Sequence, residues 1–330
     1  MFDKLRSFLR AQAADSASSS FADEGDGIHV ALPELLAQKR FVPLLSFDTL
    51  GFSKAEGLGL HRSPFRGRGM EFDEVRAYHQ GDDIRLIDWR VTARTGKAHT
   101  KLYREERDRP VLFLADFRPR MHFGTRKAFK SVIAARVLAA LAWASREHGD
   151  KIGAIVLSAT HYFKIAPHRQ LRRLMEVFNA AVVAANDEDK AKGTNLNDAL
   201  SELRRVSKNG GRVYIISDFY GFDEECKKHL TYISRHCDVV CIQVFDSLEE
   251  TPPPPGAYRI SDGHRIVTIY TDDEKWRAEY EKMFVEPRRD LENFCKSRHI
   301  IYIGLRTDQD MVQVVRRGVL TAGETECREK

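Results

Sequence analysis

From residue 110 onward, short apolar runs alternate with amphipathic stretches of helical length. Four segments are nearly continuous in apolar character, as is typical of strands buried on both faces: residues 111–115, 152–157, 213–217 and 239–245. In the stretches between them, apolar residues recur every three or four positions, which predicts helices over residues 127–148, 171–184, 198–206 and 223–236. Strands that alternate with helices predict an α/β fold with a doubly wound, mainly parallel sheet covered on both faces.

The last part of the chain follows a row of four prolines at residues 252–255, which reads as a loop between two elements or as a ligand for a proline-reading domain. The pattern then predicts a hairpin, a long helix, a strand and a last helix, over residues 258–270, 275–296, 300–303 and 311–320. Whether residues 258–303 form a separate lobe or complete the main sheet stays open.

The first part of the chain is less regular. Residues 1–27 predict a flexible segment, although Phe2, Leu5, Phe8 and Leu9 could form one face of a short helix that docks on its own domain or lies at an interface. Residues 33–50 predict a helix outside the main domain, and residues 58–107 predict short strands and irregular structure. We therefore divide the chain into residues 1–27, an extension over 28–108, a main α/β domain over 109–305, and a C-terminal helix and tail over 306–330.

Composition excludes several classes of protein. The 330 residues are 42% hydrophobic and 31% charged with a net charge of +5, a mild charge that does not decide among an acidic partner, a membrane surface and nucleic acid. A dedicated nucleic-acid binder more often has a pI above ~9 and clustered Lys and Arg residues. No window approaches the ~18 apolar residues of a membrane span, and the N-terminus is not a signal peptide. The five cysteines are scattered and predicted to be reduced. We expect a cytoplasmic protein whose membrane contact is at most peripheral, at the inner membrane.

The sequence offers no catalytic arrangement. Ser217 lacks the Gly-x-Ser-x-Gly elbow of a nucleophile, and the 12 histidines form no HExxH pair. A Walker motif is also missing, so any ATPase activity would belong to a separate chain. We therefore predict a protein that is not an enzyme and needs no cofactor.

The most specific stretch is dense in Gly, Asp, Arg and Trp. It contains Gly67-x-Gly69-x-Glu71-Phe72, then Tyr78-x-x-Gly81-Asp82-Asp83, then Ile87-Asp88-Trp89-x-x-x-Ala93-Arg94. This string resembles the signature of the bacterial family called domain of unknown function 58. The resemblance runs from about residue 43 to about residue 303, and members of that family look like von Willebrand factor A-like proteins. They are commonly encoded beside MoxR-type AAA+ ATPases, which implies an adaptor that works with such an ATPase on an unknown client protein.

The charged residues of this signature allow two interpretations. They form a self-satisfied ion-pair network anchored by buried Trp89 and Phe72, or they form a partner surface. The surface candidates are Arg66, Arg68, Glu71, Asp82, Asp83, Arg85, Asp88, Trp89 and Arg94. An alternative function is the binding of an anionic polymer or membrane surface through the arginines, although the intermixed acidic residues weaken it.

The loop after the first predicted strand of the main domain carries the second resemblance. It reads Asp116-Phe117-Arg118-Pro119-Arg120, where A-like domains have Asp-x-Ser-x-Ser and hold a divalent cation. Thr194 and Asp218 stand at the other two ligand positions, so a bound metal would use Asp116, Thr194 and Asp218. Because a guanidinium cannot ligate a cation, we predict a degenerate site without metal. Either Arg118 or Arg120 pairs with Asp116 and Asp218, or Pro119 turns both arginines toward a partner.

Overall fold

The computed structural model describes residues 25–45, 70–79, 84–105, 110–187, 193–207, 210–261 and 266–318. The chain divides into two compact units. Residues 54–108 form one, which we call the hairpin unit, and residues 1–53 together with 109–330 form the other, the sheet unit. The predicted extension over residues 28–108 is therefore not one piece, because residues 28–45 belong to the sheet unit.

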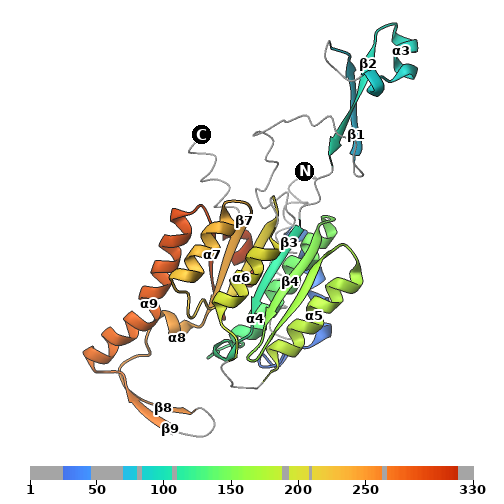
Figure 1. Cartoon of the computed structure of the whole chain (residues 1–330). Coiled ribbons are helices and arrows are strands. Elements are labelled where there is room, and N and C mark those ends of the chain that lie inside the picture. The colour runs from blue at the N-terminus through green and yellow to red at the C-terminus, as the bar shows by residue number, and fades with distance from the viewer. Residues whose placement is uncertain are drawn as a thin grey trace, which may run out of the picture. The chain divides into compact units, whose positions relative to one another are not determined.

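A six-stranded sheet forms the centre of the sheet unit, in the order β10-β7-β6-β3-β4-β5 (Figure 1). Only β5 runs antiparallel to its neighbour. The strands are β3 (Pro110–Asp116), β4 (Lys151–Leu157), β5 (Tyr162–His168), β6 (Arg212–Ser217), β7 (Asp238–Phe245) and β10 (Ile301–Arg306). This confirms the predicted α/β fold with a mainly parallel sheet. It also settles the position of the last strand, because β10 pairs with β7 and completes the main sheet.

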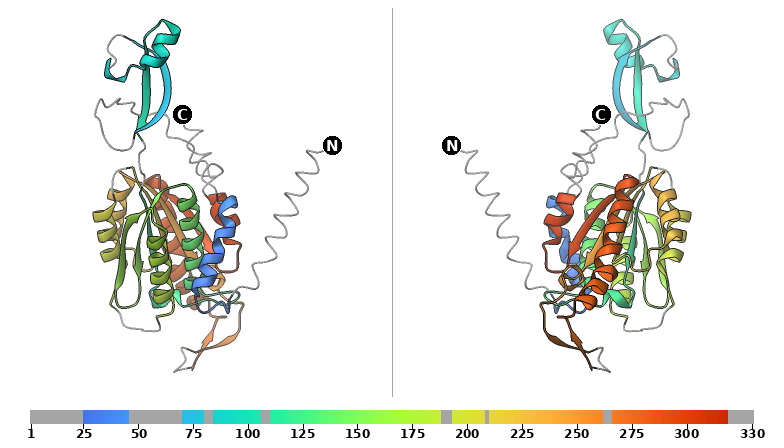
Figure 2. Two further views of the ribbon diagram at one scale, coloured as in Figure 1. Left: turned by 90° about the vertical axis from the view of Figure 1, so that its right-hand side faces the viewer. Right: turned by 90° about the vertical axis from the view of Figure 1, so that its left-hand side faces the viewer.

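Helices cover both faces of the sheet (Figure 2). The covering helices are α4 (Lys130–Glu147), α5 (Leu171–Ala185), α6 (Leu196–Val206), α7 (Glu224–Ser234) and α9 (Glu274–Ser297). Two shorter helices, α2 (Leu32–Ala37) and η2 (Gln38–Leu44), pack on α4. Side chains alternate between the two faces of a strand, so β3 contributes to two cores. Phe113 packs in the core with α4 and α5, whereas Leu112 and Leu114 pack in the core with α6 and α7.

The segment before the hairpin unit lies against α4. Leu35 and Phe41 are buried in the same core as α4, and the indole nitrogen of Trp143 donates to the carbonyl of Leu35 at 3.2 Å. Arg136 of α4 also forms an ion pair with Glu34. The prediction of a helix outside the main domain was therefore wrong, since the mixed apolar spacing belongs to two short helical turns that pack on α4. Residues 311–318 are helical and place Met311 in this core as well.

The hairpin unit consists of β1 (Met70–Ala77) paired antiparallel with β2 (His99–Glu105), with η3 (Ile84–Leu86) and α3 (Trp89–Thr95) between them. The expectation that Trp89 is a buried anchor was wrong, because its side chain is 68% exposed. Helix α3 is instead fixed through Thr92, whose hydroxyl accepts from the backbone of His99 at 3.1 Å. The side chain of Phe72 lies outside the described ones.

A second hairpin, β8 (Ala257–Ser261) with β9 (Ile266–Tyr270), follows the short helix α8 (Ser247–Glu250) and the proline-rich loop. The sequence predicted this hairpin. Of the helices that the structure describes, none is long and apolar enough to cross a membrane. Residues 1–24 and 319–330, which include the predicted N-terminal helix and C-terminal tail, lie outside the described residues.

Candidate functional site

Three carboxylates stand at the carboxyl ends of adjacent strands. Asp116 is the last residue of β3, Asp218 follows β6, and Asp246 follows β7. Because these strands are parallel neighbours, their carboxyl ends meet at one edge of the sheet. After β3 the chain continues to β4 on one side of it, and it later returns to place β6 on the other side. Such a switch point is where open α/β sheets usually place their sites.

Asp116 is fully buried and closed by an arginine two residues later. Arg118 donates from Nε to Asp116 Oδ1 at 2.9 Å and from Nη2 to Oδ2 at 2.7 Å, which is a bidentate fork. Its backbone N–H donates to Oδ1 at 3.0 Å, and the hydroxyl of Ser217 donates to Oδ2 at 2.6 Å. Both oxygens of this carboxylate therefore accept hydrogen bonds from protein donors.

These bonds determine the ionisation of the pair. Burial raises the pKa of Asp116, but the Arg118 charge and the hydrogen bonds from Arg118 and Ser217 outweigh burial and hold that pKa below its usual value. Burial lowers the pKa of Arg118, yet its attraction to Asp116 leaves that pKa raised. Asp116 is accordingly an ionised carboxylate, with its charge neutralised inside the protein.

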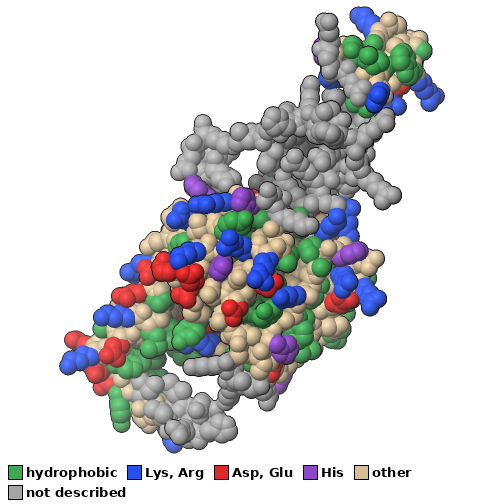
Figure 3. Space-filling view, in the orientation of Figure 1, with side chains coloured by type: hydrophobic (Ala, Val, Ile, Leu, Met, Phe, Trp, Pro, Cys, Tyr) green, Lys and Arg blue, Asp and Glu red, His purple; other side chains and the backbone are tan. Residues whose placement is uncertain are grey.

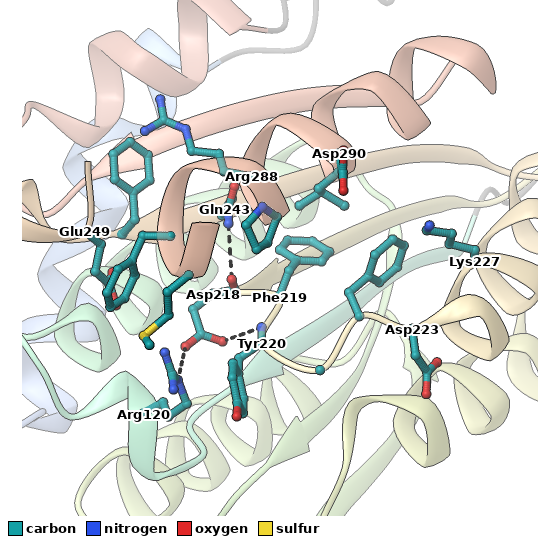
Figure 4. A pocket seen from close by; sticks show the side chains of 17 residues that line it. Arg120, Asp218, Phe219, Tyr220, Asp223, Lys227, Gln243, Glu249, Arg288 and Asp290 are labelled. Carbon is teal, nitrogen blue, oxygen red and sulfur yellow. Dashed lines mark hydrogen bonds and ion pairs between the residues drawn. The ribbon is translucent and has the colours of Figure 1, made fainter. Parts of the chain in front are cut away.

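The same guanidinium reaches toward the next strand. Arg118 Nη2 donates to the carbonyl of Tyr220 at 3.0 Å and lies 4.0 Å from Asp218 Oδ1. Arg120 lies nearer the surface, with Nε 3.8 Å from Asp218 Oδ2 and its guanidinium 3.7 Å from the centre of the Tyr220 ring (Figure 4). Of the two arrangements left open by the sequence, the inward pairing describes Arg118, whereas Arg120 is partly turned toward solvent.

A lysine that sequence reasoning did not single out completes the cluster. Lys130, in the first turn of α4, is 1% exposed and places Nζ 3.3 Å from Asp218 Oδ2 and 2.8 Å from Glu249 Oε1. A buried ammonium requires such partners, because an unpaired charge in a protein interior is very costly. We call Asp116, Arg118, Lys130, Asp218 and Glu249 the charged cluster. The sequence signal for Lys130 is a cation at the start of a helix that is mainly apolar.

Asp246 has a structural role beside this cluster. It is buried, accepts from the hydroxyls of Thr125 at 2.6 Å and Thr307 at 2.8 Å, and caps α8 by accepting from Leu248 N at 3.0 Å. The backbone N–H of Asp246 in turn donates to Glu249 Oε2 at 2.9 Å, and the two bonds together form a capping box. Asp246 thereby fixes Glu249 in the position where it meets Lys130.

Thr194, the third predicted ligand position, is used to hold a loop. Its hydroxyl donates to the carbonyl of Ser158 at 2.6 Å, which ties the segment before α6 to the end of β4. Among the described residues, no three His, Cys, Asp or Glu side chains are grouped to hold a metal ion. A dication at Asp116 would also have to displace Arg118, and at Asp218 it would meet Lys130. The donor set therefore does not fit a bound divalent cation.

A cavity of about 360 Å³ adjoins the charged cluster, between the loop after β6 and helix α9 (Figure 4). Its wall combines aromatic and aliphatic side chains with charges of both signs. Tyr220 and Met283 stand at its mouth and are 58% and 64% exposed. Other lining residues are Arg120, Asp218, Phe219, Phe245, Phe284 and Arg288. This mixture suits a ligand that presents an apolar group together with a charged one.

The predicted signature residues do not belong to the sheet unit. Arg85, Asp88, Trp89 and Arg94 belong to the hairpin unit, and the side chains of Arg85, Trp89 and Arg94 are exposed. Asp88 caps α3 by accepting from the backbone N–H groups of Arg90 and Val91. Arg66, Arg68, Asp82 and Asp83 lie outside the described residues, and so does the side chain of Glu71.

Comparison with known sequences identifies one family. Residues 74–290 match the family described as "Protein of unknown function DUF58". The uncharacterized protein Rv1480 of Mycobacterium tuberculosis is 26% identical over 287 residues, which cover 86% of this chain and 89% of that protein. The uncharacterized protein Mb1516 of Mycobacterium bovis matches with the same identity and coverage.

Solved structures give a looser likeness. An aerotolerance-related membrane protein from Bacteroides fragilis aligns with a TM-score of 0.38 and 13% identity, covering 65% of this chain and 98% of that one. The PilB minor pilin from Streptococcus sanguinis aligns with a TM-score of 0.30 and 11% identity, covering 71% of this chain and 65% of that one.

Proposed function

This chain belongs to the family described as protein of unknown function DUF58, and we propose that it acts as a non-enzymatic adaptor built on a von Willebrand factor A-like domain. In this proposal its partner is a MoxR-type AAA+ ATPase in the cytoplasm, and it presents a client protein to that ATPase for assembly or remodelling. The proposal rests on the edge of the sheet where β3 and β6 end.

The positions of two carboxylates and one threonine support the A-like part of the proposal. A carboxylate ends β3, a second follows β6, and a threonine precedes α6, as the resemblance to A-like domains requires. In those domains a bound cation captures a ligand. Here Arg118 occupies that place on Asp116, so we infer that this edge makes contacts through charge and packing, without metal.

The observation that carries the adaptor function is the pair of exposed groups at the mouth of the cavity. The Arg120 guanidinium stacks on Tyr220 at 3.7 Å, and the Tyr220 side chain is 58% exposed over a cavity of about 360 Å³. Tyrosine and arginine beside a concave surface are the residues that dominate binding energy in protein interfaces. We infer that a side chain of the ATPase or of its client enters this cavity.

The test is a binding measurement between the full chain and a purified MoxR-type AAA+ ATPase from the same organism. We expect co-purification, micromolar binding in calorimetry, and a change in ATP turnover when this chain is added. Tyr220→Ala should weaken binding by about thirtyfold, as expected for loss of an interface residue worth about 2 kcal/mol. Its backbone bond from Arg118 is unaffected, because that bond goes to the carbonyl of residue 220.

Tyr232→Ala is the matched control. Tyr232 is also an exposed tyrosine of the sheet unit, at 42%, and it stacks with Arg204 but does not line the cavity. It should leave binding unchanged. The proposal fails if the ATPase neither binds at micromolar concentration nor changes its turnover, and the assignment of the cavity fails if both tyrosine variants weaken binding equally.

A further inference from the structure

The hairpin unit exposes three large apolar side chains that the adaptor function does not use. Ile84 is 64% exposed, Trp89 68% and Leu86 36%, and all three lie within six consecutive residues. Single exposed apolar residues are common, but three within one short segment, one of them a tryptophan, point to an interaction site. Figure 3 shows hydrophobic and basic side chains next to one another on this unit.

The same stretch carries a net positive charge. Residues 84–101 hold five basic residues and one acidic residue, a net charge of +4. Asp82 and Asp83, which directly precede the stretch, lie outside the described residues. The basic residues are Arg85, Arg90, Arg94, Lys97 and Lys101. The one carboxylate, Asp88, accepts two backbone N–H bonds and lies 3.5 Å from Lys101 Nζ, so it contributes little to the outer field.

This surface is already formed in the free protein. Asp88 caps the start of α3, and Gly96 ends it at a φ of 70° with its N–H bonded to the Thr92 carbonyl. Thr92 in turn accepts from the backbone N–H of His99, at the start of β2. Trp89 and the arginines are therefore held on a short rigid helix, and binding would not require this helix to fold.

We propose that Ile84, Leu86, Trp89, Arg90 and Arg94 bind the surface of a bilayer that contains anionic lipid. Tryptophan prefers the headgroup level of a bilayer, aliphatic side chains enter the acyl boundary, and guanidinium groups bind lipid phosphates. A nucleic acid would also attract the arginines, but it would leave Ile84 and Leu86 in water. The hairpin unit thus serves as a peripheral anchor, in addition to the adaptor function of the sheet unit.

The test measures sedimentation of the full chain with vesicles of phosphatidylglycerol and phosphatidylcholine in equal parts, and with vesicles of phosphatidylcholine alone. We expect binding to the mixed vesicles that weakens as salt is added, and little binding to phosphatidylcholine. Removing one basic residue should weaken binding about fivefold, so Arg90→Gln with Arg94→Gln should weaken it about twenty-five-fold. Trp89→Ala should also weaken binding, whereas Trp89→Phe should retain most of it. All the changed side chains are exposed, and unaltered circular dichroism confirms folding.

Arg172→Gln with Arg173→Gln is the matched control, since it removes the same charge from exposed positions on α5. It should leave vesicle binding nearly unchanged, and an equal loss would overturn the proposal. The proposal is also overturned if the wild-type chain does not bind mixed vesicles, or if only loss of Lys4, Arg6 and Arg10 abolishes binding. Competition by duplex DNA that is insensitive to Trp89→Ala would assign the arginines to nucleic acid instead.

Discussion

Replacing Arg118 by methionine is expected to lower the free energy of unfolding by about 3 kcal/mol at pH 7. Asp116 is 0% exposed and would lose three hydrogen bonds from the guanidinium together with its compensating charge. Removing one partner of a buried ion pair costs about 3–5 kcal/mol. The Ser217 hydroxyl and the backbone N–H of residue 118 would still donate to Asp116, which places the cost near the lower limit.

The stability difference between the wild-type chain and Arg118→Met should also depend on pH, in a direction that the pKa of Asp116 determines. In the wild-type chain the folded-state pKa of Asp116 is depressed, so its stabilisation is present above the unfolded pKa and is lost as pH falls through the folded pKa. In the Arg118→Met variant, burial remains without the opposing charge, so the pKa of Asp116 should be raised instead. The variant should then lose stability as pH rises from about 4, the unfolded pKa of an aspartate. The difference in stability between the two proteins should be smaller at pH 4.5 than at pH 7.

Urea denaturation at the two pH values measures this difference. Arg120→Met is the control, because the Arg120 side chain is 43% exposed with Nε 3.8 Å from Asp218 Oδ2, and such a pair contributes about 0–1 kcal/mol. In a second control, Asp116→Leu with Arg118→Met removes both charges and should restore much of the lost stability. The reasoning is refuted if Arg118→Met costs no more than Arg120→Met at pH 7, or if the difference persists at pH 4.5.

Three further outcomes can be measured on the same protein. Lys130→Met should cost about 3 kcal/mol in urea denaturation, because it leaves Asp218 and Glu249 without their buried cation; a cost below about 1 kcal/mol would contradict the pairing. Calorimetric titration with Mg²⁺ or Mn²⁺ should show no saturable micromolar binding. Binding that is present in the wild-type chain and absent in Asp116→Ala would contradict the metal-free interpretation. Burial raises the pKa of Cys226 to about 12, so this thiol should react with a thiol reagent at pH 8 only after unfolding, and prompt modification in the native protein would disprove its burial.

The central strands were predictable because each is a mainly apolar run with a polar residue at its end or directly after it. Phe113 and Leu114 point to opposite faces, and both faces are covered, so residues 111–115 are apolar at every position. The carboxylates at the ends of β3 and β6 followed from the same pattern. Inward pairing of an arginine was one of two predicted arrangements, and it was foreseeable because a residue two positions after Asp116 can reach back to it.

Other parts of the site depend on contacts between distant segments, and local patterns do not record these. Lys130 meets Glu249, which is 119 positions away, only because α4 and α8 come together at the same edge of the sheet. The burial of Trp89 was misjudged for a related reason. A tryptophan in a charged segment is expected to anchor it, but here the backbone caps and Thr92 fix α3, and the indole is left exposed.

The position of Lys130 shows that the arginines in the loop after β3 are not the only cations that neutralise the carboxylates at this edge of the sheet. If Arg118 alone took the place of a cation, replacing Arg118 and Arg120 by serine would be enough to restore a cation site. Lys130 comes from a different element, is 1% exposed, and neutralises Asp218 independently of that loop. Its ammonium is in turn fixed by Glu249, which the capping box of α8 holds in place. Two cations from two elements therefore neutralise the carboxylates at the ends of β3 and β6. Substitutions in that loop alone would leave Asp218 paired with Lys130. We therefore infer that protein cations, and not a metal ion, neutralise both carboxylates at this edge of the sheet.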